Sequence, residues 1–117
     1  MKIKKIDHIG IAVKDLEEAL KLYTDIFSLE IKKIEEFKDL KVKIAFLPVG
    51  EVMVELVQPT STDAPLAKRI RENGEGLYHL ALRVENVDEA LQKMKQSGIE
   101  MRDKEPRLGG MGSKIAF

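Results

Sequence analysis

Two segments of the chain alternate bulky apolar side chains with small or polar ones, which is the period of a half-buried β-strand. The first segment covers residues 6–13 and the second covers residues 77–84. Each segment carries one of the chain's two histidines, His8 and His79, on the face opposite its bulky residues. The shared alternation predicts two similar strands with the histidines in equivalent positions.

The likeness of the two segments continues along the chain at a constant offset of 71 residues. Each predicted strand is followed by an N-cap residue, Asp15 or Asn86, and then by apolar side chains at helical spacing. We predict one helix over residues 15–27 and a second from Asn86 to Gly98, a residue type that favours the position after a helix. One supersecondary unit therefore occurs twice.

The rest of the sequence predicts strands, turns and a connecting segment. We predict strands at 31–37, 42–47, 52–57, 99–102 and 113–117, a hairpin turn at 48–51, and a short helix from near Asp63 to Asn73-Gly74. The predicted fold class is α+β, with paired β-α-β-β-β modules that form a curved mixed sheet, a cup with the helices outside. We expect one domain over residues 1–117, with a first module at 1–59, a connector at 60–76 and a second module at 77–117.

The second module is shorter than the first by one strand. At the repeat offset, the counterpart of the strand at 52–57 would fall at about residues 123–128, after Phe117. We therefore expect a chain that is truncated at its C-terminus and lacks this last strand, together with an acidic residue at about position 126.

Composition excludes several classes of partner. Lys and Arg together number 20, Asp and Glu also number 20, and no block of like charge stands out, so neither nucleic acid nor an anionic membrane is expected as a partner. No apolar run approaches the roughly 18 residues of a membrane span, and the N-terminus lacks the apolar region of a signal peptide. With no cysteine to form disulfides, we expect a cytoplasmic protein that acts on a small molecule.

The paired histidines are the best candidates for chemistry. His8 and His79 share a strand face with small neighbours, and neutral imidazole is the commonest metal ligand. Glu55 is the one carboxylate inside the apolar run at 52–57, and a charge there needs a partner. Imidazole with carboxylate favours a divalent transition metal, Zn, Co, Mn, Ni or Fe. The alternatives are half-buried histidines bonded to neighbours, and a Glu55 that points into water from an edge strand.

Two basic residues could act on an anionic ligand. By alternation, Lys43 shares its face with Ala45 and Leu47, and its amine could bind a carboxylate or act as a base if desolvated. Protection of an edge strand is an equally good explanation for this lysine. Arg83 lies on the His79 face and could hold an anionic group, although a structural ion pair at the rim would place it there as well.

In the repeated strands and in the positions of His8, Glu55 and His79, the sequence resembles the vicinal-oxygen-chelate superfamily, which includes glyoxalases, extradiol dioxygenases and antibiotic-resistance proteins. Within that superfamily it is most similar to the methylmalonyl-CoA epimerases. A histidine on such a strand is common to the superfamily, whereas the order of motifs from Glu55 to His79 is closer to the epimerases. The matching stretches are residues 7–13, 45–50, 55–59, 64–67, 74–79 and 105–110.

The resemblance implies an isomerase that interconverts the 2R and 2S forms of methylmalonyl-CoA by 1,1-proton transfer through a metal-stabilised enolate. Carried over by position, His8, Glu55 and His79 look like metal ligands, an acyl-CoA is the implied substrate, and we expect a homodimer. A glutamate base of some epimerases falls where this chain has Lys43. Two other functions remain open: a glyoxalase-type lyase acting on a glutathione hemithioacetal, and a module that binds a small antibiotic-like ligand without catalysis.

Overall fold

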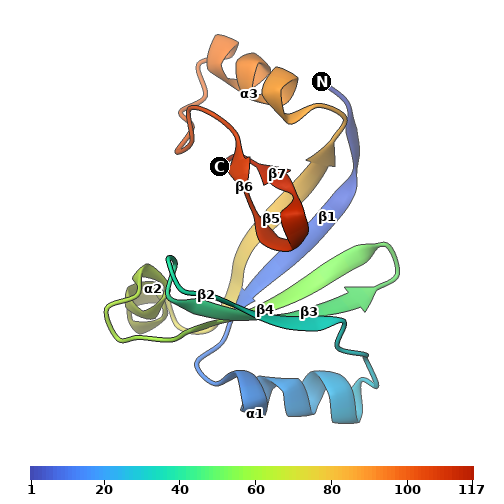
Figure 1. Cartoon of the computed structure of the whole chain (residues 1–117), viewed down its shortest axis with the longest axis vertical. Helices are drawn as coiled ribbons and strands as arrows, with labels where there is room; N and C mark the ends of the chain where they lie inside the picture. Colours follow the sequence, from blue (N-terminus) through green and yellow to red (C-terminus); the bar gives the residue numbers. More distant parts are fainter. The chain divides into compact units, whose positions relative to one another are not determined.

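The computed structural model describes all residues from Met1 to Phe117 and divides the chain into two compact units. The first unit is Ile6–Ala81, and the second consists of Met1–Lys5 with Leu82–Phe117. Two strands, β1 (Ile3–Ala12) and β5 (Gly76–Val84), each contribute residues to both units (Figure 1).

The first unit is built on a mixed sheet. Its further elements are α1 (Leu16–Leu20), the π-helical segment η1 (Lys21–Ile26), β2 (Lys33–Phe37), β3 (Val42–Val49), β4 (Val52–Pro59) and α2 (Pro65–Asn73). The five strands follow the order β2-β3-β4-β1-β5, with β1 parallel to β4 and with β3 antiparallel to both β2 and β4. The expected α+β class with a mixed sheet is therefore confirmed.

The first predicted helix begins as the sequence indicates. The Asp15 side chain accepts a hydrogen bond from the Glu18 amide at 3.2 Å, which satisfies one of the free N–H groups of the first turn. Beyond Leu20 the helix widens into η1, where the Phe27 amide donates to the Leu22 carbonyl five residues back. Apolar spacing predicted a helix in this segment but could not distinguish its π-helical part, because the six residues of η1 are too few to define a period.

Apolar side chains cover both faces of the sheet. One cluster joins α1 to the sheet through Val13, Leu16, Ala45, Leu47 and Leu56. A second cluster joins α2 to the sheet through Ala12, Val42, Val57, Leu66 and Ile70. Because consecutive strand residues point to opposite faces, neighbours such as Ala12 and Val13 enter different clusters. The sheet is thus packed between α1 on one face and α2 on the other.

The second unit contains the end of β5, α3 (Val87–Gln96), β6 (Arg107–Leu108), the 3₁₀ turn η2 (Gly110–Gly112) and β7 (Lys114–Ile115). The cap predicted for its helix is present, because Asn86 accepts from the Glu89 amide at 3.0 Å. Strands β6 and β7 form a separate two-stranded ladder of two residue pairs.

The strand predicted at 99–102 is wrong. Gly98, with φ +77°, ends α3, and its amide donates to the Lys95 carbonyl while the Ile99 amide donates to the Met94 carbonyl. This pair of bonds is a Schellman motif, and it uses the Ile99 N–H that a strand would need. The strand predicted at 113–117 is confined to β7, because the Phe117 carbonyl instead accepts from the Asp103 amide.

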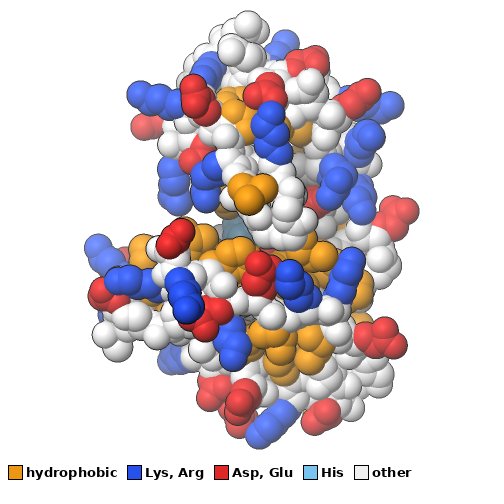
Figure 2. All heavy atoms as spheres, viewed as in Figure 1, with side chains coloured by type: hydrophobic (Ala, Val, Ile, Leu, Met, Phe, Trp, Pro, Cys, Tyr) orange, Lys and Arg blue, Asp and Glu red, His pale blue; other side chains and the backbone are white.

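Charged side chains of both signs are interspersed on the face seen in Figure 2, as expected from the equal numbers of acidic and basic residues. None of the helices combines the length and the apolar character needed to cross a membrane.

Candidate functional site

The two histidines of the chain meet in the first unit. His8 lies on β1 and His79 on β5, which are neighbouring strands of the sheet. Their Nε2 atoms are 2.9 Å apart, and the rings stand edge to face with an interplanar angle of 89° and centroids 5.0 Å apart. Strand alternation places both side chains on the same face of the sheet, so the repeat in the sequence becomes a pair of imidazoles in space.

Glu55 lies beside the pair on β4. It is paired in register with Gly10 of β1, which places its side chain on the same face as His8. Only 9% of Glu55 is exposed, and its Oε2 lies 3.4 Å from His8 Nδ1. The three residues selected from the sequence are therefore neighbours, with Glu55 contacting the Nδ1 edge of the His8 ring and His79 contacting its Nε2 edge.

Asp7 is a further member of the site that sequence reasoning missed. Its Oδ2 lies 2.8 Å from His8 Nδ1, closer than Glu55 does. Strand alternation directs consecutive side chains to opposite faces, and for that reason it gave no indication of this contact. If His8 Nδ1 carries the proton and donates it to Asp7, His8 Nε2 is left with its lone pair directed toward His79.

Burial shifts the titration of two of these groups. Burial, with a smaller contribution from His8, lowers the pKa of His79 from 6.5 to about 4. The His79 imidazole is therefore neutral at physiological pH and keeps a lone pair available. Burial also raises the pKa of the Glu55 carboxyl above its ordinary value, although the neighbouring His8 opposes this shift.

The donor atoms fit a divalent transition metal in chemistry and, for the histidines, in spacing. The two Nε2 atoms are 2.9 Å apart, close enough for both to bind one ion at a metal–nitrogen distance of roughly 2.0–2.1 Å. Nowhere in the chain do three or more His, Cys, Asp or Glu side chains already converge as a metal-binding group. The Glu55 carboxylate would have to turn from His8 Nδ1 toward the Nε2 pair to become a third ligand.

Lys43 lies on the opposite side of the sheet. It is paired in register with Gln58 of β4, and the Gln58 Oε1 accepts a hydrogen bond at 2.7 Å from the Leu16 amide at the start of α1. Glu55, by contrast, is paired with Phe46, which lies three residues from Lys43 on β3 and therefore points to the other face of the sheet. The structure therefore brings Lys43 to the α1 face of the sheet and does not bring it to the histidines. Arg83 follows His79 on β5 but belongs to the second unit.

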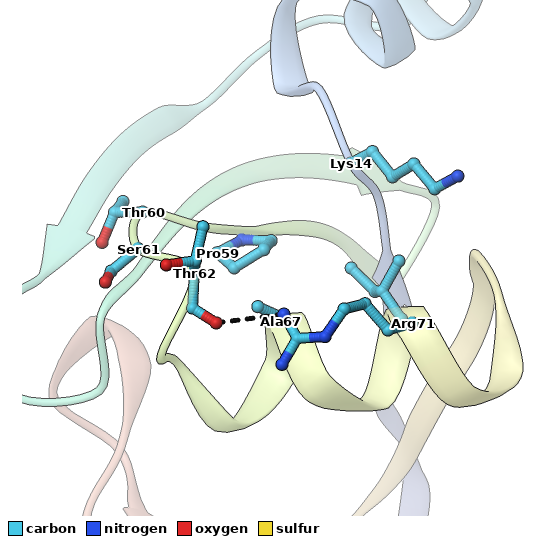
Figure 3. Close-up of a pocket in the computed structure, with 8 residues that line it drawn as sticks. Lys14, Pro59, Thr60, Ser61, Thr62, Ala67 and Arg71 are labelled. Carbon is cyan, nitrogen blue, oxygen red and sulfur yellow. Dashed lines mark hydrogen bonds between the residues drawn. The ribbon is translucent and has the colours of Figure 1, made fainter.

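A groove of about 390 Å³ lies in the first unit, where the parallel strands β1 and β4 end. Its floor is apolar, and Arg71 crosses one side to donate to the Thr62 carbonyl at 3.0 Å (Figure 3). The lining residues are Lys14, Pro59, Thr60, Ser61, Thr62, Ala67, Ile70 and Arg71. Neither histidine is among them, so this groove and the histidine pair are different places on the unit.

The chain belongs to the glyoxalase/bleomycin resistance protein/dioxygenase superfamily, whose family model matches residues 7–117. This match confirms the resemblance inferred from the strand and histidine motifs. A solved methylmalonyl-CoA epimerase in complex with methylmalonyl-CoA and NH4+ is 32% identical, with a TM-score of 0.93 over 99% of this chain and 85% of that one.

Two curated relatives are similar to this chain over nearly its whole length. The uncharacterized protein YqjC of Bacillus subtilis is 34% identical over 98% of this chain and 82% of its own length. The mitochondrial methylmalonyl-CoA epimerase of Mus musculus is 26% identical over 99% of this chain, which spans 66% of the mouse protein. The relatives of this chain therefore include methylmalonyl-CoA epimerases.

Proposed function

We propose that this chain is a metal-dependent epimerase that interconverts the 2R and 2S forms of methylmalonyl-CoA by 1,1-proton transfer. The observation that carries the proposal is the pair of imidazoles, with Nε2 atoms 2.9 Å apart and the buried Glu55 beside them. The similarity to a solved epimerase bound to methylmalonyl-CoA supports this substrate class. A cytoplasmic homodimer remains part of the proposal.

In this proposal His8 and His79 hold a divalent transition metal through their Nε2 atoms, and Glu55 is the third ligand. When bound, such an ion stabilises the negative charge that develops on the substrate oxygens as the α-proton leaves. Asp7 would accept a hydrogen bond from His8 Nδ1 at 2.8 Å and so fix the tautomer in which Nε2 carries the lone pair. The low pKa of His79, about 4, keeps its ring neutral and able to coordinate at physiological pH.

Lys43 is the base that the sequence suggests, and its position on the α1 face makes the suggestion testable. If the lysine removes the α-proton, Lys43→Met should abolish exchange of that proton while leaving metal affinity unchanged. If Lys43 only protects its strand, the variant should exchange at the rate of the unmodified protein. We expect the second result, because Lys43 is paired in register with Gln58 of β4, whose side chain contacts the start of α1 on the face of the sheet opposite the histidines.

The test of the proposed function is isotope exchange. In D₂O with Co²⁺ or Mn²⁺ added, the protein should introduce deuterium at the α-carbon of methylmalonyl-CoA, because proton removal precedes inversion. Mass spectrometry of the recovered thioester reads this exchange, and His79→Ala should abolish it. No exchange together with turnover of a glutathione hemithioacetal would identify a glyoxalase-type lyase instead. Tight binding of a small ligand without metal or turnover would indicate a binding module.

A further inference from the structure

Gly10 lies on β1 next to the paired rings of His8 and His79. It follows His8 by two residues on β1, so both lie on the same face, and its register partner on β4 is Glu55. The His79 ring lies over this glycine. A Cβ built on Gly10 would stand 2.6 Å from His79 Cε1, 2.8 Å from Nδ1 and 3.0 Å from Nε2.

Glycine is needed at position 10 because a side chain there would meet the His79 ring, and not because of the backbone conformation of Gly10. Gly10 is absent from the glycines with positive φ, so its backbone is one that any residue can adopt. Glycine inside a strand weakens the strand, since it has no side chain to pack and loses more chain entropy on folding. A strand glycine without a backbone reason marks a close approach, and here the group that approaches is the His79 imidazole.

We propose that Gly10 is a positioning residue whose missing side chain seats the His79 ring against His8. This inference rests on the proposed function in assigning the two Nε2 atoms to one metal ion. The contact that a methyl group would create falls on the end of the His79 side chain, which can rotate away, and not on backbone. Gly10→Ala should therefore fold normally and fail specifically at the separation of the two imidazoles.

Two measurements test the role of Gly10. In the metal-free protein, NMR should detect cross-relaxation between the ring protons of His8 and His79, whose centroids are 5.0 Å apart, and Gly10→Ala should remove it. In a Co²⁺ titration followed by calorimetry and by the d–d absorption band, Gly10→Ala should bind about 10–100-fold more weakly, the usual effect of disturbing a group that orients a ligand. Its band should also change in position.

The matched control is a double-mutant cycle with His79→Ala. Removal of the ring removes the clash, so Gly10→Ala should cause no further loss of Co²⁺ affinity in the His79→Ala background. An equal loss in both backgrounds would overturn the proposal, because the added methyl would then act through the strand itself. Retained cross-relaxation with unchanged Co²⁺ affinity in Gly10→Ala would overturn it as well.

Failure of the proposed function gives a different pattern. If the unmodified protein binds no Co²⁺ but loses the contact between the His8 and His79 rings in Gly10→Ala, the assignment of a metal fails and the positioning role of Gly10 stands. If the unmodified protein binds Co²⁺ and Gly10→Ala binds it equally well, the metal assignment stands and the role of Gly10 fails.

Discussion

The two units begin alike in sequence and end differently in structure. Both contain a strand followed by a helix whose first turn is capped by a polar side chain. In the first unit, β3 and β4 are eight residues each, and β3 is paired along both edges. In the second unit, β6 and β7 have two residues each and pair only with one another. Similar local signals are thus followed by eight-residue strands in the first unit and by two-residue strands in the second.

The difference extends to the packed core. The side chains of Ala45, Leu47 and Leu56 in the first unit are completely inaccessible to solvent. In the second unit the buried apolar residues are Ala90 and Leu91 of α3, and Leu91 also borders a hollow of about 450 Å³. The candidate site is therefore placed on the unit with the deeper core, where β1, β4 and β5 hold its side chains at fixed positions.

The largest effect that separates the two units should come from truncating their core leucines. Leu56→Ala removes a side chain that is 0% exposed and should lower the free energy of unfolding by about 2–5 kcal/mol. Leu91→Ala should cost less, because Leu91 is already 4% exposed and borders a hollow of the second unit. Urea denaturation followed by circular dichroism measures both losses. Equal losses would contradict the contrast between the two cores.

The next effect concerns Asp7, which supports the site in the first unit. Asp7→Ala removes the acceptor 2.8 Å from His8 Nδ1 and should weaken Co²⁺ binding about 10–100-fold with little change in stability. Asp7→Asn is the matched control, because its amide oxygen can still accept a hydrogen bond from His8 Nδ1, and it should retain most of the affinity. A calorimetric titration compares the three proteins. Equal affinity of Asp7→Ala and the unmodified protein would show that His8 needs no such orientation.

Sequence reasoning was most successful where local chemistry decides structure. The caps at Asp15 and Asn86, the end of α3 at Gly98 and the main strands of the first unit follow from signals within a few residues. The choice of His8, His79 and Glu55 rested on a repeat and on one charge inside an apolar run, and the structure places these three residues side by side.

What the sequence could not provide depends on neighbours that are distant in the chain. The sheet face of Lys43 is fixed by its pairing with Gln58, which is known only once the register is known. The residues at 99–102 have strand-like composition, but the hydrogen bond from Ile99 to Met94 ends α3 there instead. The place of Gly10 beneath the His79 ring depends on β5 lying next to β1.

A smaller effect should appear in the pH dependence of the metal-free protein. The pKa of His79 is about 4 in the folded chain and 6.5 in its ordinary state, so between these values the unfolded chain binds the extra proton. The contribution of His79 to stability is therefore complete above about pH 6.5 and is lost as the pH falls toward 4. Glu55, whose pKa is raised, contributes with the opposite sign, because folding favours its protonated form.

Comparison with His79→Gln separates the two contributions, since Glu55 is present in both proteins. The difference in Tm between the unmodified protein and His79→Gln should shrink or reverse from pH 7 to pH 5 in the presence of a chelator. A constant difference over that range would show that the His79 ring is not held in its low-pKa environment in solution.

The smallest effect tests whether the two helix starts remain equivalent despite the unequal units around them. Asp15→Ala and Asn86→Ala each remove a side-chain oxygen that accepts an N–H of the first turn, at 3.2 Å and 3.0 Å, and each should cost about 0.5–2 kcal/mol. Asp15→Ser and Asn86→Ser keep an acceptor and serve as controls with little loss. Hydrogen exchange read by NMR locates the effect: Asp15→Ala should speed exchange in α1, and Asn86→Ala should do so in α3. If Asn86→Ala leaves α3 unchanged while Asp15→Ala speeds exchange in α1, the two helix starts are alike in sequence alone. Packing against the rest of the second unit would then hold α3 without its cap.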